Sequence, residues 1–149
     1  MPKIAPTISV KWQRFEALTG DELYELLRFR QNIFVVEQRS PFPDLDGLDR
    51  EAWHLLLRAK GALAGYARLV PQPLRIGRVA VAAELRRHGL GRRLMEEALL
   101  LCRAQYPGLQ VVLTAQAHLV PFYRGFGFEP TAQPYDDFGL THVDMALRR

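Results

Sequence analysis

The sequence predicts an α/β fold in which helices pack on a mixed sheet. The main indication is a strongly apolar-periodic helix that begins near Leu90 and lies between two strand-like runs, 74–81 and 109–114. A helix in this place lets the two strands run parallel, because parallel neighbours need a long crossover connection. Two further apolar runs meet at Lys60-Gly61, which is typical of an antiparallel hairpin. We expect one domain, 1–149, because nearly half of the residues are apolar and no repeat divides the chain.

The first third of the chain predicts a strand and then a helix. Aromatic and β-branched residues favour a strand over 8–15. Thr19 and Glu22 have the spacing of a capping box, which marks the start of a helix. The apolar face of this helix carries Leu23, Leu26, Leu27 and Phe34. We expect the helix to end at 35–38 and to lead into a loop rich in proline and aspartate, 40–49.

The rest of the chain alternates strands with two helices. Strands are expected at 53–58, 62–70, 74–81, 109–114, from 128 onward and at 140–147, and helices at 90–106 and 118–124. Gly77 marks a bulge or a close approach within its strand. Pro121 fits only in the early part of the second helix, because proline lacks the N–H that a helix interior uses.

Composition and charge limit the classes of partner. The net charge of +4 suits an anionic ligand but is too small to demand nucleic acid or a membrane surface. No stretch is apolar enough to span a bilayer, and the N-terminus lacks the apolar run of a signal peptide. The single cysteine, Cys102, excludes an internal disulfide and falls on the apolar face of its helix. We therefore expect a cytoplasmic protein.

The loop 40–49 contains an acidic cluster that is not a typical metal site. The spacing of Asp44, Asp46 and Asp49 resembles a calcium loop only in part, because the glycine is misplaced and Leu48 stands at a ligand position. The four histidines lack metal-ligand spacing, so no metal is expected. The aspartates attract a cationic acceptor or are simply solvated. Arg30, on the apolar side of its helix, needs a partner or an opening to water.

A basic helix start is the most informative stretch of the chain. It reads Arg86-Arg87-His88-Gly89-Leu90-Gly91-Arg92-Arg93 and follows the strand 74–81. The first turn of a helix exposes unpaired N–H groups and the positive end of the dipole, where acidic residues normally gather. Four arginines and a histidine at this end favour a bound anion, and phosphate is the obvious candidate. The alternative is that the arginines extend into water and the glycines only form the turn.

Several blocks together resemble the GCN5-related N-acetyltransferase (GNAT) superfamily, and within it the ElaA-like branch. The blocks are the turn Arg86-x-x-Gly89-x-Gly91 after Val79-Ala80-Val81, the run 122–128, and the stretches 33–38, 46–49, 76–79, 115–119 and 135–145. They cover nearly the whole chain in the right order. The resemblance implies the GNAT fold, a central mixed and mostly antiparallel sheet with one parallel, splayed strand pair, flanked by helices.

The resemblance also implies acetyl-CoA as the co-substrate and names the residues that would hold it. The backbone N–H groups of Arg87, His88, Gly89, Leu90, Gly91 and Arg92 would cradle the pyrophosphate. Arg86 would order the turn and face the phosphates. The strand residues Val79 and Val81 would hydrogen-bond the pantetheine arm through their backbone as an added strand does, and Ala80 between them would also contact the cofactor. Gln116 stands where many GNAT proteins have an asparagine near the cofactor.

The family's general acid corresponds to Tyr123, which would protonate the leaving thiolate of coenzyme A. The alternative is that Tyr123 only packs with its aromatic neighbours. The general base is less clear: Glu37, His54 and His142 are candidates, and we favour Glu37. Glu37 alternatively pairs with Arg30 or Arg78, and His54 is alternatively a satisfied strand histidine. A covalent intermediate on Cys102 is not expected, because its helix face is buried.

The expected function is transfer of an acetyl group from acetyl-CoA to a primary amine by direct attack in a ternary complex. The acceptor is a small molecule or a protein amino group. One alternative is a non-catalytic module of GNAT fold that binds acyl-CoA as a sensor. A weaker one is an RNA-binding protein, but no aromatic residues stand beside the arginines to stack on bases. The sequence leaves the oligomeric state open, a dimer being one alternative.

Overall fold

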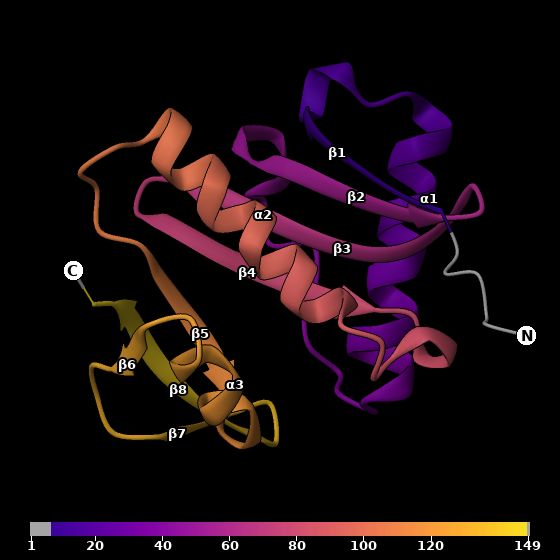
Figure 1. The fold of residues 1–149 in the computed structure, drawn as a ribbon. Coiled ribbons are helices and arrows are strands. Elements are labelled where there is room, and N and C mark those ends of the chain that lie inside the picture. Colours follow the sequence, from indigo (N-terminus) through magenta and orange to yellow (C-terminus); the bar gives the residue numbers. More distant parts are fainter. Residues whose placement is uncertain (1–6, 149) are drawn as a thin grey trace, which may run out of the picture.

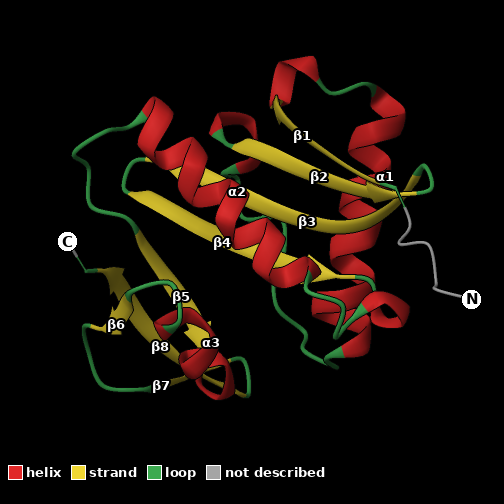
Figure 2. Ribbon diagram, in the orientation of Figure 1, coloured by secondary structure: helices red, strands yellow, loops and turns green. Residues whose placement is uncertain are grey.

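The computed structural model describes residues 7–148, and within them eight strands form one sheet (Figures 1 and 2). The strands are β1 (Ile8–Arg14), β2 (Trp53–Ala59), β3 (Ala62–Pro71), β4 (Leu74–Val81), β5 (Val112–Gln116), β6 (Phe128–Pro130), β7 (Tyr135–Asp137) and β8 (Leu140–Leu147). Their order is β1-β2-β3-β4-β5-β8-β6, with β7 also paired to β8. The pairs are antiparallel except for β4 with β5. The predicted fold class is therefore confirmed.

The parallel pair is short and open. β4 and β5 are joined in register only at Arg75 and Val112, and beyond this point the two strands diverge toward their C-terminal ends (Figure 1). β4 also carries a bulge opposite β3, where the register shifts between Tyr66 and Arg68. Arg78 lies in this bulge with a left-handed φ of 53°. The bulge expected near Gly77 is thus present, and it bends β4 at the place where the strands separate.

Helices cover both faces of the sheet. α2 (Leu90–Gln105) lies across one face over β3 and β4, and α1 (Gly20–Arg30) lies on the other face (Figure 1). α3 (Val120–Arg124) is a short helix after β5. Alternation along β3 decides which residues meet each layer: Ala67 and Leu69 join the core under α2, whereas Tyr66 faces Arg30 of α1.

The predicted end of the first helix, at 35–38, is confirmed, because a π-helical segment, Gln31–Glu37, continues α1 to Glu37. Other predicted boundaries need correction. The strand expected at 109–114 is displaced to 112–116, and Leu109 is exposed. The helix expected at 118–124 is a 3-10 turn, Ala117–Leu119, followed by α3, with Pro121 in its first turn as expected. β7 is a separate strand that the sequence pattern does not predict.

Other local predictions are confirmed. Thr19 and Glu22 make both hydrogen bonds of the capping box, each at 3.0 Å. The Lys60-Gly61 hairpin has left-handed φ at both residues, as a tight two-residue turn requires. Cys102 is buried, and burial raises the pKa of its thiol to about 11, so the thiol stays protonated. Among residues 7–148, no helix is long and apolar enough to cross a lipid bilayer.

The packing of α2 on the sheet supplies a stability test. Leu94 is fully buried, and its Cδ1 atom would lie only 3.2 Å from a Cβ added at Gly65 of β3. We expect Leu94→Ala to lower the free energy of unfolding by about 2–5 kcal/mol, because it leaves a cavity in a close-packed layer. Leu100→Ala is the matched control, since Leu100 lies on the same helix and is 55% exposed. Urea denaturation of both variants measures the difference, and equal losses would contradict the assignment of the buried face.

Candidate active site

A cleft of about 410 Å³ lies where β4 leaves β5. Its wall includes Val79 of β4, Gln116 of β5, Tyr123 of α3 and His142 of β8. Aromatic side chains from the π-helical segment and two loops complete the wall: Phe34, Phe42 and Phe138. The cleft therefore combines backbone from two diverging strands with a phenol, an imidazole and an apolar surface.

The backbone of β4 faces this opening at its C-terminal end. Ala82 N donates to Ala64 O at 2.8 Å, and Gly65 pairs in register with Val81. In an antiparallel ladder this makes Gly65 and Val81 a non-hydrogen-bonded pair, so the N–H and C=O of Val81 point away from β3. The Val81 carbonyl accepts a hydrogen bond of 3.0 Å from Arg86 Nε. The edge of β4 that would normally pair with a neighbouring strand therefore faces the opening between β4 and β5.

The N-terminus of α2 lies at the wide end of the diverging strands (Figure 1). Arg87 and Gly89 have left-handed φ of 68° and 81°, which form the turn before the helix. No side chain caps the helix, and its first turn contains no acidic residue. A Cβ added at Gly89 would meet no heavy atom within 4 Å. The first-turn N–H groups therefore have no side-chain cap at the positive end of the helix dipole.

Three of the four arginines at this turn are paired with glutamates. Arg92 and Arg93 form ion pairs one turn along α2. Arg86 binds Glu37 through two hydrogen bonds, of 2.6 and 3.0 Å, and so joins the turn to the end of the π-helical segment. The expected pairing of Glu37 with Arg30 or Arg78 is wrong, because both of those arginines bind aspartates instead.

Tyr123 lies between the core and the cleft. Its side chain is 8% exposed and packs edge-on against Phe122 and Phe128, with ring centroids 5.0 and 6.5 Å away. The same residue lines the cleft. Burial raises the pKa of Tyr123 to about 12, so the phenol keeps its proton at neutral pH. Tyr123 therefore packs against its aromatic neighbours and lines the cleft at the same time.

The first turn of α2 contacts α3, which brings Tyr123 near the helix N-terminus. The Arg92 guanidinium lies 5.5 Å from the centre of the Phe126 ring. A Cβ added at Gly91 would lie 3.6 Å from the edge of the Phe122 ring. The basic turn and the buried phenol therefore belong to one connected region of the structure.

The remaining candidate residues lie in different surroundings. Gln116 lines the cleft and donates a hydrogen bond of 3.2 Å to Gln38 Oε1. His142 also lines the cleft, whereas Glu37 is half-exposed beside Arg86 and is not part of the cleft wall. His54 is fully buried, and burial lowers its pKa. It donates from Nε2 to Asp49 O and accepts at Nδ1 from Tyr66, which confirms it as a satisfied strand histidine.

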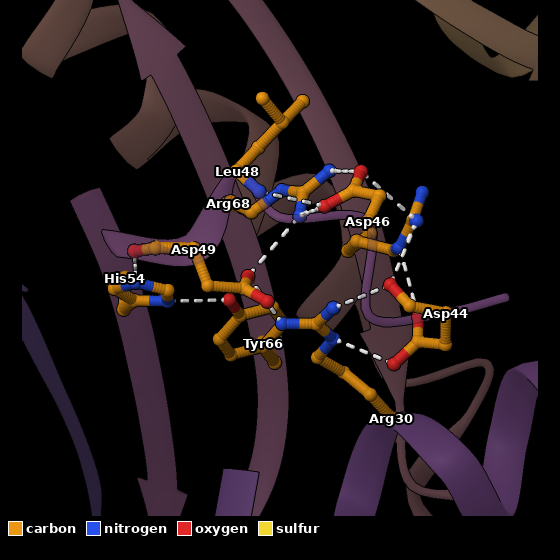
Figure 3. Close-up of polar contacts among 9 residues, drawn as sticks. Arg30, Asp44, Asp46, Leu48, Asp49, His54, Tyr66 and Arg68 are labelled. Carbon is orange, nitrogen blue, oxygen red and sulfur yellow. Dashed lines mark hydrogen bonds and ion pairs between the residues drawn. The ribbon is translucent and has the colours of Figure 1, made fainter. Parts of the chain in front are cut away.

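A partly buried ionic cluster, which the sequence does not predict as a unit, joins α1, β3 and β4 to the loop 40–49 (Figure 3). Its members are Arg30, Arg68, Arg78, Asp44, Asp46 and Asp49. One of its members, Arg78, also lines the cleft. Arg30, whose side chain is completely buried, donates to Asp44 Oδ2 at 3.1 Å and to Asp49 Oδ1 at 2.6 Å. The partner that Arg30 requires is thus the loop 40–49. The sequence does contain an arginine on the apolar side of a helix and three aspartates in the loop 40–49, but no local pattern indicates that they pair with one another.

The cluster also ties the loop to the bulge of β4. Arg68 donates to both carboxylate oxygens of Asp46, at 2.9 and 2.8 Å. Arg78, in the bulge, donates to Asp44 Oδ1 at 2.8 Å and to the Asp44 carbonyl at 3.0 Å. Three arginines therefore neutralise three aspartates. The expectation that these aspartates are solvated or attract a cationic acceptor is wrong, because arginines of the chain already occupy their oxygens.

Comparisons with known proteins agree with this geometry. A family model described as an acetyltransferase (GNAT) domain matches residues 44–149. The UPF0039 protein sll0451 of Synechocystis is 40% identical over 148 residues, covering 95% of this chain and 96% of that protein. The crystal structure of Escherichia coli ElaA superposes with a TM-score of 0.90 at 37% identity, covering 95% of this chain and 100% of that one. An acyl-CoA N-acyltransferase from Pseudomonas aeruginosa has a TM-score of 0.90, 35% identity and the same coverage.

Asp46 provides a test of the ionic cluster. Burial raises its pKa, but hydrogen bonds from Arg68 and Leu48 N–H and the charges of Arg68 and Arg78 outweigh burial and lower the pKa to about 2. A lowered pKa stabilises the fold above the ordinary aspartate value, and this stabilisation is lost as the pH falls through the folded-state pKa. We expect the destabilisation caused by Asp46→Asn to be largest near neutral pH and to shrink between about pH 4 and about pH 2.

Urea unfolding of wild type and variant across this pH range measures that difference. Asp137→Asn is the matched control, because Asp137 is exposed on β7. A constant difference between wild type and Asp46→Asn at every pH would contradict the pairing.

Proposed function

The chain belongs to the GNAT acetyltransferase family, and we propose that it transfers an acetyl group from acetyl-CoA to a primary amine. The transfer is a direct attack in a ternary complex. One observation carries the proposal: a buried, protonated phenol faces the cleft where β4 leaves β5, next to an uncapped helix N-terminus. The likeness to the Pseudomonas aeruginosa acyl-CoA N-acyltransferase, at 35% identity, supports the same class of reaction.

The residues at the turn fit the pyrophosphate of coenzyme A. We propose that backbone N–H groups of the turn cradle the pyrophosphate. They belong to Arg87, His88, Gly89, Leu90, Gly91 and Arg92. This proposal is supported by the open space at Gly89 and by the absence of an acidic residue in the first turn of α2. Arg86 is held by hydrogen bonds to Glu37 and to the Val81 carbonyl, and so connects the turn to the π-helical segment and to the end of β4.

The pantetheine arm is proposed to lie along β4 over Val79, Ala80 and Val81 and to hydrogen-bond the backbone of Val79 and Val81. Support comes from the direction of the Val81 peptide groups, which point away from β3. Gln116, on the opposite strand, is proposed to contact the same arm, since its side chain lines the cleft. Bound acetyl-CoA would supply the activated acetyl group as a thioester.

Tyr123 is proposed as the general acid that protonates the departing sulfur. The amine nitrogen attacks the thioester carbonyl carbon, the C–S bond breaks, and the electron pair leaves on sulfur. A phenol whose pKa is raised to about 12 holds its proton until the thiolate forms. The acceptor amine, from a small molecule or a protein, is proposed to enter by the aromatic part of the wall, where the ring centroids of Phe42 and Phe138 lie 6.2 Å apart.

We expect Tyr123→Phe to lower kcat by about 10²- to 10⁴-fold, the usual contribution of a general acid, because the thiolate then leaves unprotonated. The affinity for coenzyme A is expected to stay within about threefold, since the ring and its packing are kept, a free-energy change below about 1 kcal/mol. Thiol release from acetyl-CoA measures kcat, and calorimetry with coenzyme A measures affinity.

The acceptor panel is ethylamine, 2-phenylethylamine, spermidine and an Nα-acetyl-lysine peptide. Tight binding of coenzyme A with no thiol release in any member of this panel would overturn the proposed transfer and favour a non-catalytic acyl-CoA-binding module. Equal losses of affinity and kcat in Tyr123→Phe would instead show that Tyr123 only packs beneath the site.

Arg86 supplies a separate test of the phosphate end. Arg86→Gln removes the charge and the paired hydrogen bonds to Glu37, so we expect the KM for acetyl-CoA to rise about tenfold, with a smaller change in kcat. The matched control is Arg103→Gln in the last turn of α2, at the far end of the helix from the turn. Steady-state kinetics at two salt concentrations measures both variants. The same rise in both variants would contradict a local role for Arg86.

A further inference from the structure

His142 lies on the opposite face of the sheet from Tyr123, although both residues line the cleft. Val143 and Met145 of β8 are buried in the core that contains Tyr123. Because side chains alternate along a strand, His142 faces the other side. It stands opposite Gln116 in the β5–β8 register, at the wide end of the diverging strands. An amine that enters from this side therefore meets His142 before it reaches a thioester lying against Tyr123.

The hydrogen bonds of His142 leave one ring nitrogen available to accept a proton. Nδ1 lies 2.9 Å from Leu140 O, and because a carbonyl only accepts, Nδ1 carries the hydrogen. In the neutral ring Nε2 then has a free lone pair. No hydrogen bond to Nε2 comes from any residue between 7 and 148. The ring is also stacked on Tyr135, with centroids 6.3 Å apart and an interplanar angle of 29°, which fixes its orientation.

The charges around His142 come from three strands. Carboxylates lie on its own strand at Asp144 and on β7 at Asp137, whereas β4 contributes Arg75 and Arg78 to the cleft wall. Asp144 accepts hydrogen bonds of 2.9 Å from Thr114 and from Tyr135, and the Arg78 charge is balanced by Asp44 and Asp46. Tyr135, the ring stacked on His142, is therefore itself held by a hydrogen bond to the Asp144 carboxylate.

We propose that His142, rather than Glu37, is the general base of the transfer. This inference rests on the proposed function. Nε2 takes a proton from the protonated acceptor amine, and the freed nitrogen attacks the thioester carbonyl carbon. As the new N–C bond forms and the C–S bond breaks, Tyr123 gives a proton to the departing sulfur, and the nitrogen loses its second proton, which returns to the Tyr123 phenolate through water. The products are an N-acetylated amine and coenzyme A thiol, after which His142 releases its proton to water. Glu37 is less suited, because both of its carboxylate oxygens bind Arg86 and it lies outside the cleft wall.

His142→Asn tests this role, because an amide N–H can still donate to Leu140 O but the side chain cannot accept a proton. With the fastest amine of the panel above, we expect kcat to fall at least about 100-fold. With hydroxylamine, which is largely unprotonated at neutral pH, the loss is expected to stay below about tenfold, since less depends on a base. The KM for acetyl-CoA is expected to change little in both assays.

Two further variants separate a base from a structural role. His142→Ala is expected to recover activity when free imidazole is added, a result that lost packing alone does not give. Glu37→Gln is expected to raise the KM for acetyl-CoA through Arg86 and to reduce the rates with both nucleophiles equally, without imidazole rescue.

The results that overturn the inference are specific. Equal losses with both nucleophiles in His142→Asn, or no rescue of His142→Ala together with a nucleophile-selective loss in Glu37→Gln, would reject His142 as the base while leaving the transfer intact. A wild-type protein that acetylates no amine of the panel would reject the proposed function and this inference with it.

Discussion

The separation of β4 from β5 is the constraint on which the rest of the site depends. A parallel pair normally continues for several residues, but here only Arg75 and Val112 pair, and the strands then part. The separation creates the cleft and turns the β4 backbone toward it. It also connects the two faces of the sheet, so that Tyr123 on one face and His142 on the other line the same space.

The ionic cluster explains how this opening is held in shape. Arg78 lies in the bulge that bends β4, and its guanidinium binds Asp44 and Asp46 of the loop beside the cleft. Arg30 holds the same loop against α1. Buried ion pairs add little net stability, because desolvation offsets their attraction, but removing one partner from such a pair costs about 3–5 kcal/mol. We therefore interpret the cluster as a device that specifies one arrangement of loop and bulge.

The two ends of the cleft have different chemical characters. At the α2 end, N–H groups and arginines provide positive charge, and Glu37 serves to hold Arg86 in place. At the β8 end, an imidazole with a defined tautomer stands beside aromatic side chains. In the proposed transfer, Tyr123 donates a proton from one face of the sheet and His142 accepts one on the other, while one bond forms at the carbonyl carbon and another breaks. This division is consistent with direct transfer and leaves Cys102, buried in the core, without a chemical role.

The sequence by itself determined the fold class, the hairpin, the capping box and the basic turn before α2, because each depends on residues that are close together in the chain. It also placed Tyr123 in a family motif as a candidate general acid, and this role stays a prediction. Only the tertiary structure decided the partners of the charged residues. Arg30 and Asp44 are separated by 14 positions, and Glu37 and Arg86 by 49. Their pairing depends on how the loop and the π-helical segment pack on the sheet. The same packing keeps Glu37 out of the cleft wall and brings His142 into it, because long-range contacts rather than local pattern decide which side chains share a cavity.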